Sequence, residues 1–295
     1  MPHTCPPSTG RPDDRASASG RSLASSPPGG WDAHVHVFEA GAPILAGHYT
    51  PDERPLAEIE RLAATHGIGH LVLVQPSVYG RDHQVLLRAL RAGGGRHCGI
   101  AVLDAAVTDA ELDALHHAGV RGLRFNLVSP VGQAGEPGAE LRALAPRLRE
   151  RGWHVQWYVQ AHQLQALVPW QAATGLTFVL DHLAGLHAQL DHDAAAWAAA
   201  RALADAGAWL KLSGWYRLQS APPYRDLALH VQRAAGLFGP RMVWGSDWPH
   251  TAFERAQVPR YDEMLAPARE ALGAVAFNRV LCDHPPLLYS PSRSC

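Results

Sequence analysis

Short hydrophobic runs alternate with segments of helical periodicity along most of the chain. Eight runs are nearly continuous, which is typical of parallel β-strands covered on both faces. The predicted strands are Trp31–Val37, His70–Gln75, Cys98–Leu103, Gly122–Phe125, His154–Val159, Thr177–Asp181, Ala208–Leu212 and Met242–Gly245. Between them, segments with hydrophobic residues at helical spacing predict amphipathic helices. The clearest of these segments are Pro55–His66, Leu141–Arg151 and Asp191–Ala206.

Eight strand-then-helix units indicate one particular architecture. They occupy about 250 residues, which is the usual size of a (β/α)8 barrel. The main alternative, a doubly wound open sheet, usually carries a nucleotide-binding loop after its first strand. The sequence contains neither GxGxxG nor GxxxxGK[ST]. We therefore predict an α/β fold, a single-domain TIM barrel, without a nucleotide cofactor.

The first 29 residues differ in composition from the rest. They are rich in Pro, Ser, Gly and Arg and contain no apolar run. Such a segment cannot bury enough apolar surface to offset the entropy lost on ordering, and it does not resemble a secretory signal. We expect residues 1–29 to be a disordered tail and residues 30–295 to form the barrel.

Composition narrows the possible partners. The formal net charge is -1 and no basic stripe stands out, which argues against nucleic acid. No hydrophobic stretch is long enough to cross a membrane. The four cysteines are scattered without metal-type spacing, which favours a reducing, cytoplasmic setting. We expect a cytoplasmic protein that binds a small molecule, as a monomer or a small homo-oligomer.

Polar residues alternate along the first predicted strand. Asp32, His34 and His36 are two residues apart, so their side chains are expected on one face. If that face points into the barrel, the two imidazoles lie about 6.6 Å apart along the strand. An HxH pair alone is weak evidence, because most isolated histidines are surface or satisfied core residues.

The other strands also end in polar residues. In a barrel the carboxyl ends of all strands meet at one rim, so these side chains are expected to form one concave site. Alone, each has a plain structural explanation; Asp181, for example, is suited to capping the next segment. Their repetition around one rim favours a functional site. The predicted core of this site is His34, His36, His182 and Asp247, surrounded by Ser77, Arg124, Asn126, Tyr158, Arg217 and His250.

Four motifs resemble those of the amidohydrolase superfamily: DAHVH, DHLAG, KLSGWYR and GSDWPH. The likeness covers essentially Trp31 to Tyr289. It is strongest to the branch that contains 2-pyrone-4,6-dicarboxylate lactonase and sugar-acid lactonases. The resemblance implies a lactone hydrolase in which Asp247 is the general base for the attacking water. It also implies that the three histidines polarise the substrate carbonyl or hold a metal ion that does so.

The resemblance implies substrate contacts as well. The residues that match positions gripping carboxylate or hydroxyl groups in the dicarboxylate lactonase are Ser77, Arg124, Tyr158 and Arg217. That enzyme has a further arginine where this chain has Pro130. Without the second arginine, the pyrone dicarboxylate is a poorer fit. We expect a related lactone with one anionic group, or a sugar lactone.

Cofactor use follows from the same resemblance. Superfamily members with two metal ions use a bridging lysine or glutamate on a middle strand, where this chain offers Tyr158 and Gln160. We expect no required metal, or one zinc-like ion bound by the histidines and Asp247. The alternatives are a zinc-dependent decarboxylase of an aromatic acid, a lactone isomerase, and a catalytically silent binding barrel. The retained Asp247 argues against the last.

Overall fold

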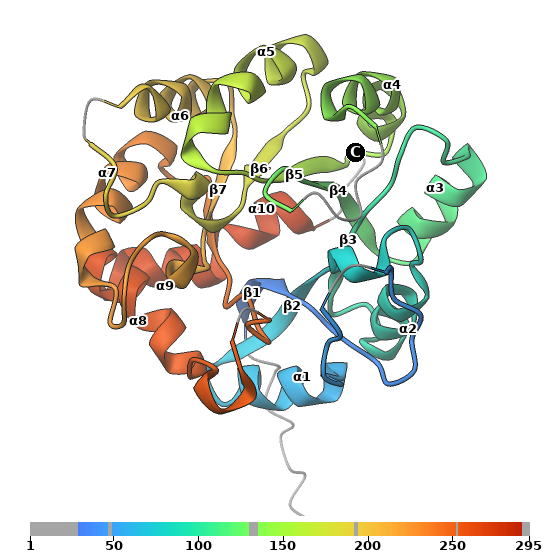
Figure 1. Ribbon diagram of the computed structural model, residues 1–295, viewed down its shortest axis with the longest axis horizontal. Coiled ribbons are helices and arrows are strands. Elements are labelled where there is room, and N and C mark those ends of the chain that lie inside the picture. Colours follow the sequence, from blue (N-terminus) through green and yellow to red (C-terminus); the bar gives the residue numbers. More distant parts are fainter. Residues whose placement is uncertain (1–28, 47–48, 130–134, 192–193, 252, 291–295) are drawn as a thin grey trace, which may run out of the picture.

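The computed structural model describes residues 29–46, 49–129, 135–191, 194–251 and 253–290. Eight parallel strands run in the order β1 to β8, with helices arranged around them (Figure 1). The strands are β1 (Gly30–Val35), β2 (Ile68–Val74), β3 (Cys98–Ala101), β4 (Val120–Asn126), β5 (His154–Tyr158), β6 (Phe178–Leu180), β7 (Trp209–Leu212) and β8 (Met242–Trp244). The α-helices are α1 (Leu56–Ala64), α2 (Gln84–Ala92), α3 (Asp109–His117), α4 (Pro137–Glu150), α5 (Leu164–Thr174), α6 (Ala195–Asp205), α7 (Ala228–Phe238), α8 (Tyr261–Leu272), α9 (Ala274–Cys282) and α10 (Pro285–Tyr289).

The sheet closes between its first and last strands. A parallel bridge joins Val35 to Trp248, and the His36 N–H donates to the Trp248 carbonyl at 2.8 Å. Just before it, the Asp247 N–H donates to the His34 carbonyl at 2.9 Å. The predicted TIM barrel is confirmed, and each predicted strand is present with ends that differ by no more than two residues.

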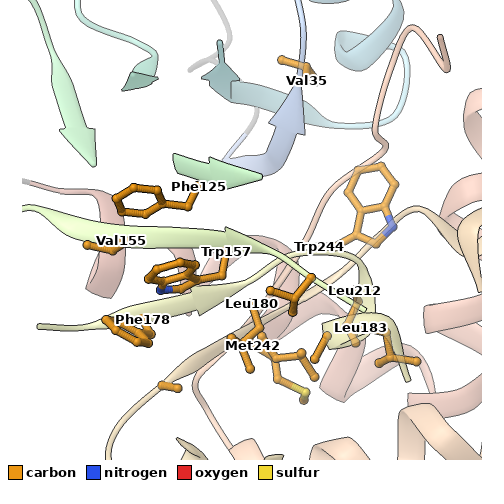
Figure 2. Close-up of a cluster of buried hydrophobic side chains, with 14 of the residues drawn as sticks. Val35, Phe125, Val155, Trp157, Phe178, Leu180, Leu183, Leu212, Met242 and Trp244 are labelled. Carbon is orange, nitrogen blue, oxygen red and sulfur yellow. The ribbon is translucent and has the colours of Figure 1, made fainter. Parts of the chain in front are cut away.

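Two hydrophobic clusters stabilise the barrel. The larger one fills the space between the sheet and the helices, where Phe125 and Phe178 pack on either side of Trp157 (Figure 2). The smaller one lies inside the barrel and includes Tyr289 of α10, whose ring stacks on Trp31 with centroids 5.8 Å apart. In Figure 1, α10 lies near the centre of the ring of helices. This apolar packing closes the amino end of the barrel and leaves the carboxyl end for polar chemistry.

Local sequence explains where several helices begin and end. α3 begins with a capping box, in which Thr108 Oγ1 accepts from the Glu111 N–H and the Glu111 carboxylate accepts from the Thr108 N–H. α5 ends at Gly175, whose φ of 61° is left-handed and suits glycine. These local signals fix where α3 begins and where α5 ends.

Some expectations concern residues that the structure does not describe. Apart from Gly29, the expected tail lies outside the described residues, and so does Pro130. Within the described ranges, no helix combines the length and apolar character needed to cross a membrane.

Candidate active site

The ends of β1, β6 and β8 bring three of the predicted core residues together. Ligand atoms of His34, His182 and Asp247 all lie within 4.8 Å of one another, and all three residues are buried. His36 Nε2 lies 3.6 Å from Asp247 Oδ1, the same distance as His34 Nε2. The four side chains that the sequence predicts at the core of the site therefore face one small volume at the rim of the barrel.

Two of these residues have unusual backbone conformations. His182 has a φ of 49° and Asp247 a φ of 64°, in the left-handed region that costs a residue with a side chain about 1–3 kcal/mol. Gly214, itself at a φ of 59°, lies against the His182 ring, and a Cβ there would be 2.5 Å from Nδ1. The fold thus retains strain and uses a glycine to aim these side chains into the site.

The two oxygens of Asp247 have different surroundings. Oδ2 accepts hydrogen bonds from the Tyr216 hydroxyl at 2.6 Å and from Arg217 Nε at 2.8 Å. Oδ1 is buried and has no hydrogen-bond partner among the described residues. Burial alone raises the pKa of Asp247, but the positive charge of Arg217 is foremost among the groups that outweigh it and hold the pKa well below its usual value. Asp247 is therefore ionised at neutral pH, with Oδ1 facing the histidines.

His36 and His182 are held in place by contacts of their Nδ1 atoms. His36 Nδ1 lies 2.7 Å from the Val74 carbonyl, which requires a proton on Nδ1 and leaves the Nε2 lone pair toward the site when the ring is neutral. His182 Nδ1 lies 3.0 Å from Ser213 Oγ. Burial lowers the pKa of His182 to about 3, and burial also lowers the pKa of His34 well below its usual value. His34 and His182 are therefore neutral at pH 7.

A second buried carboxylate lies behind the histidines. Asp181 Oδ2 accepts from Arg124 Nε at 3.0 Å and from Gln156 Nε2 at 3.2 Å, whereas Oδ1 lies 3.4 Å from Lys211 Nζ. Burial alone raises the pKa of Asp181, but neighbouring positive charge, with Lys211 foremost, holds the pKa well below its usual value. The interpretation of Asp181 as a helix cap is wrong, because its side chain makes no capping hydrogen bond to the short helix that follows.

The predicted substrate contacts surround this core. The Tyr158 ring lies between two guanidinium groups, with its centroid 5.3 Å from Arg124 Cζ and 5.6 Å from Arg217 Cζ. On the other side of β4, Asn126 Nδ2 donates to Ser77 Oγ at 3.1 Å. Both pairs lie at the rim where the sequence expects them. Arg217, however, uses Nε to bind Asp247, so part of its guanidinium is already engaged.

Cavities open beside this arrangement. One of about 450 Å³ reaches Tyr158, His182 and Arg217 and extends toward the start of α6. Another of about 460 Å³ lies between the loops after β1 and β8 and reaches His250. Both ring nitrogens of His250 are buried without a hydrogen-bond partner in the described chain. Both nitrogens can therefore form hydrogen bonds with a bound ligand.

Asp32 does not join the histidines as the alternation predicts. Its Oδ1 accepts from the backbone N–H groups of His34 and Ser246, and its Oδ2 accepts from the Tyr261 hydroxyl of α8 at 2.8 Å. The pairing of β1 with β2 shifts register between Asp32 and Val35, so strict alternation fails there. Asp32 instead ties β1, the β8 loop and α8 together.

Three neighbours of the site are not predicted from the sequence as part of it: Asp181, Lys211 and Tyr216. The signal for Lys211 is a charged residue in the middle of the hydrophobic strand Trp209–Leu212, which is difficult to explain unless the side chain has a buried partner. Tyr216 has no comparable signal, because a tyrosine after a strand is common.

The donor set fits one divalent ion. His34 Nε2 and Asp247 Oδ1 are buried and lack partners among the described residues, and His182 supplies a third ligand atom close by. Two imidazoles and a carboxylate are ligands that suit zinc. The expectation of one divalent metal or none therefore holds, and these three residues are the ones that would bind it.

Comparison with known proteins identifies the family. Residues 31–283 match the amidohydrolase family. The chain is 31% identical to a 2-pyrone-4,6-dicarboxylate hydrolase from Comamonas testosteroni, covering 90% of this chain and 91% of the relative. This chain therefore belongs to the amidohydrolase family, a family of TIM-barrel enzymes, and the predicted resemblance is confirmed.

Other relatives carry related activities. The chain is 30% identical to a 4-sulfomuconolactone hydrolase from Rhizobium radiobacter, over 89% of this chain and 90% of the relative. It is 27% identical to a D-galactarolactone isomerase from Agrobacterium fabrum, over 90% and 92%. A structure from Acinetobacter baumannii, provisionally named a 2-pyrone-4,6-dicarboxylic acid hydrolase and containing citric acid, is 25% identical with a TM-score of 0.74, over 88% of this chain and 99% of that one.

Proposed function

We propose that this enzyme hydrolyses a small lactone that carries an acidic group. The observation that carries the proposal is the convergence of Asp247 Oδ1 with His34 and His182, because ester cleavage needs a proton acceptor and a polarised carbonyl in one place. The names of the relatives, which include two lactone hydrolases, support the same reaction class.

The charge of the site supports an anionic substrate. Arg124 and Lys211 share the single carboxylate of Asp181, and Arg217 is paired with Asp247. Among these five groups, three positive charges therefore accompany two carboxylates. Hydrogen bonds of Arg124 within the described chain use only Nε, which leaves its terminal nitrogens for a substrate carboxylate or sulfonate. The citric acid in the related Acinetobacter structure is also consistent with an anion-binding family site.

In the proposed mechanism, a water molecule next to Asp247 Oδ1 attacks the lactone carbonyl carbon. Oδ1 accepts the proton of the water as the new C–O bond forms, while Tyr216 and Arg217 hold Oδ2 in place. N–H groups of His34 and His182 donate to the oxygen that becomes negative, and each such donor typically contributes about 2.7–4 kcal/mol. The ring C–O bond then breaks, and the proton on Asp247 passes to the departing ring oxygen.

With a metal ion bound, the group that polarises the substrate carbonyl would be different. If His34, His182 and Asp247 bind a divalent ion, that ion supplies Lewis-acid polarisation and acidifies bound water. The chain's own residues retain their other tasks, with Arg124 binding the acidic group and Tyr216 and Arg217 orienting Asp247.

The test is a lactone panel assayed with protein purified without added metal, together with metal analysis of the same sample. We expect ring opening of acidic lactones at neutral pH, in preference to neutral lactones of the same ring size. Product analysis separates the alternatives, because an isomerase returns a lactone and a decarboxylase releases CO2. Either of those products, without an open-chain acid, would overturn the proposal.

A further inference from the structure

Lys211 is the only lysine in the chain, and every other residue of the Lys/Arg type is arginine. It lies on β7 with its side chain fully buried. Lysine and arginine are not interchangeable where a small, point-like donor is needed, since the guanidinium is larger and planar. A sequence that otherwise uses only arginine therefore has its lysine at a buried position beside the site.

The Lys211 ammonium is placed between two partners. Nζ lies 3.4 Å from His34 Nδ1, in a long hydrogen bond, and 3.4 Å from Asp181 Oδ1. His34 Nδ1 is also 3.4 Å from Asp181 Oδ1, but no donor is aligned with that oxygen among the described residues. The hydrogen-bond geometry at Nδ1 thus favours the ammonium donor over the carboxylate acceptor.

The identity of this partner decides where the His34 proton lies. An ammonium group donates and has no lone pair to accept with, so Nδ1 beside it must accept. A neutral imidazole then carries its proton on Nε2, the atom that faces Asp247 Oδ1. His36 is the opposite case, because its Nδ1 lies at the Val74 carbonyl and must donate. The two histidines of the first strand therefore present different atoms to the site.

We propose that Lys211 is a positioning residue that fixes His34 as the Nε2–H tautomer. In this form His34 donates a hydrogen bond to the substrate carbonyl oxygen, and its proton must shift to Nδ1 before Nε2 can bind a metal ion. If Lys211 is removed, Asp181 Oδ1 is the remaining neighbour of Nδ1, and the proton moves to Nδ1. The role in polarising a carbonyl rests on the proposed lactone hydrolysis, whereas the tautomer itself does not.

The decisive measurement needs no substrate and is made on the wild-type enzyme, with one variant used only for signal assignment. Histidine labelled with ¹⁵N in both ring positions reports the tautomer of His34 by NMR in the metal-free protein, with a His34→Gln sample to assign the signal. We expect the proton on Nε2. A wild-type signal with the proton on Nδ1 would overturn the proposal, whatever the enzyme hydrolyses.

The variants Lys211→Met and Asp181→Asn separate the two neighbours of Nδ1. In Lys211→Met we expect the proton to move to Nδ1, zinc affinity measured by calorimetry to rise roughly 10- to 100-fold, and metal-free turnover to fall. Asp181→Asn retains Lys211, so we expect the Nε2–H tautomer and no gain in zinc affinity. Because loss of a positive charge alone strengthens zinc binding, an unchanged tautomer in folded Lys211→Met would count against the proposal even if zinc binds more tightly.

Failure of the two proposals is distinguishable. If no lactone is opened but His34 carries its proton on Nε2, the proposed function fails and the role of Lys211 stands. If lactones are opened while the proton lies on Nδ1, the reverse is true. Should Lys211→Met fail to fold, the double variant Lys211→Met/Asp181→Asn removes both buried charges together, and His34 should then lose its strong preference for one tautomer.

Discussion

At the scale of single residues, the unequal oxygens of Asp247 define the first prediction. Asp247→Asn keeps the size of the side chain and an oxygen for Tyr216 and Arg217, but it removes the proton acceptor. We expect kcat for lactone opening to fall roughly 10²- to 10⁴-fold, the usual contribution of a general base, with KM within a few-fold of wild type. Asp262→Asn, an exposed position on α8, is the matched control and should be neutral. Retained turnover in Asp247→Asn would remove this residue from the mechanism.

Arg124 gives a prediction about affinity. Arg124→Met removes the terminal guanidinium nitrogens available to an anionic group, so KM for acidic lactones should rise by roughly 10-fold or more, the usual effect of removing a charge-assisted hydrogen bond. Neutral lactones should be affected much less. Arg121→Met is the control on the same strand, because Arg121 binds backbone carbonyl groups of His116 and Val120. An equal loss on acidic and neutral lactones would show that Arg124 acts through Asp181 instead.

At the scale of secondary-structure elements, the sequence predicts the barrel well and the buried polar network poorly. Eight hydrophobic runs identify the strands because each is covered on both faces, and strand ends such as His182 and Asp247 identify the rim. The position of the Asp32 side chain is not predicted correctly, because the register of β1 shifts. The contact between Lys211 and Asp181 is not predicted, because the two residues become adjacent only after β6 and β7 pair. No pattern along the chain encodes which inward-facing side chains meet.

The contact between β1 and β8 supplies a prediction at this scale. Gly245 directly follows β8 and lies so close to β1 that a Cβ would be 2.6 Å from His34 Cβ and 2.8 Å from His34 N. Gly245→Ala must push the strands apart and displace Asp247 from His34. A misplacement of about 1 Å costs roughly 100-fold in rate, so we expect a loss of that order in kcat/KM.

The control for this prediction is Gly236→Ala in α7, where nothing lies within 4 Å of the added Cβ. That change should leave turnover intact and stabilise the protein by about 0.5–1 kcal/mol, because alanine is the better helix former. Thermal unfolding of both variants separates the two effects. Wild-type turnover in folded Gly245→Ala would contradict the view that close packing of these strands sets the site.

At the scale of the whole molecule, the barrel interior changes character along its axis. The amino end is filled by the aromatic rings of Trp31 and Tyr289, and the carboxyl end holds the ionised groups of the site. His154 of β5 lies close to these aromatic rings, with its ring centroid 5.4 Å from that of Tyr289. Its Nε2 atom has no hydrogen-bond partner in the described chain. Burial therefore disfavours the charged form of His154 inside the barrel, which couples folding to pH.

This coupling gives a prediction for acid unfolding. Burial, and after it the positive charge of Lys211, lowers the pKa of His154 from 6.5 to about 3. Below pH 6.5 the unfolded chain therefore binds a proton at this position that the folded protein does not, so the free energy of unfolding falls as the pH falls from 6.5 toward 3. The contribution of one such group is about 1.4 kcal/mol per pH unit.

The variant His154→Leu removes this contribution. The free energy of unfolding, measured by urea titrations between pH 6.5 and 4.5, should therefore depend less steeply on pH, by about one proton. Parallel curves for wild type and His154→Leu would mean that His154 is already protonated, or accessible to protons, inside the folded barrel.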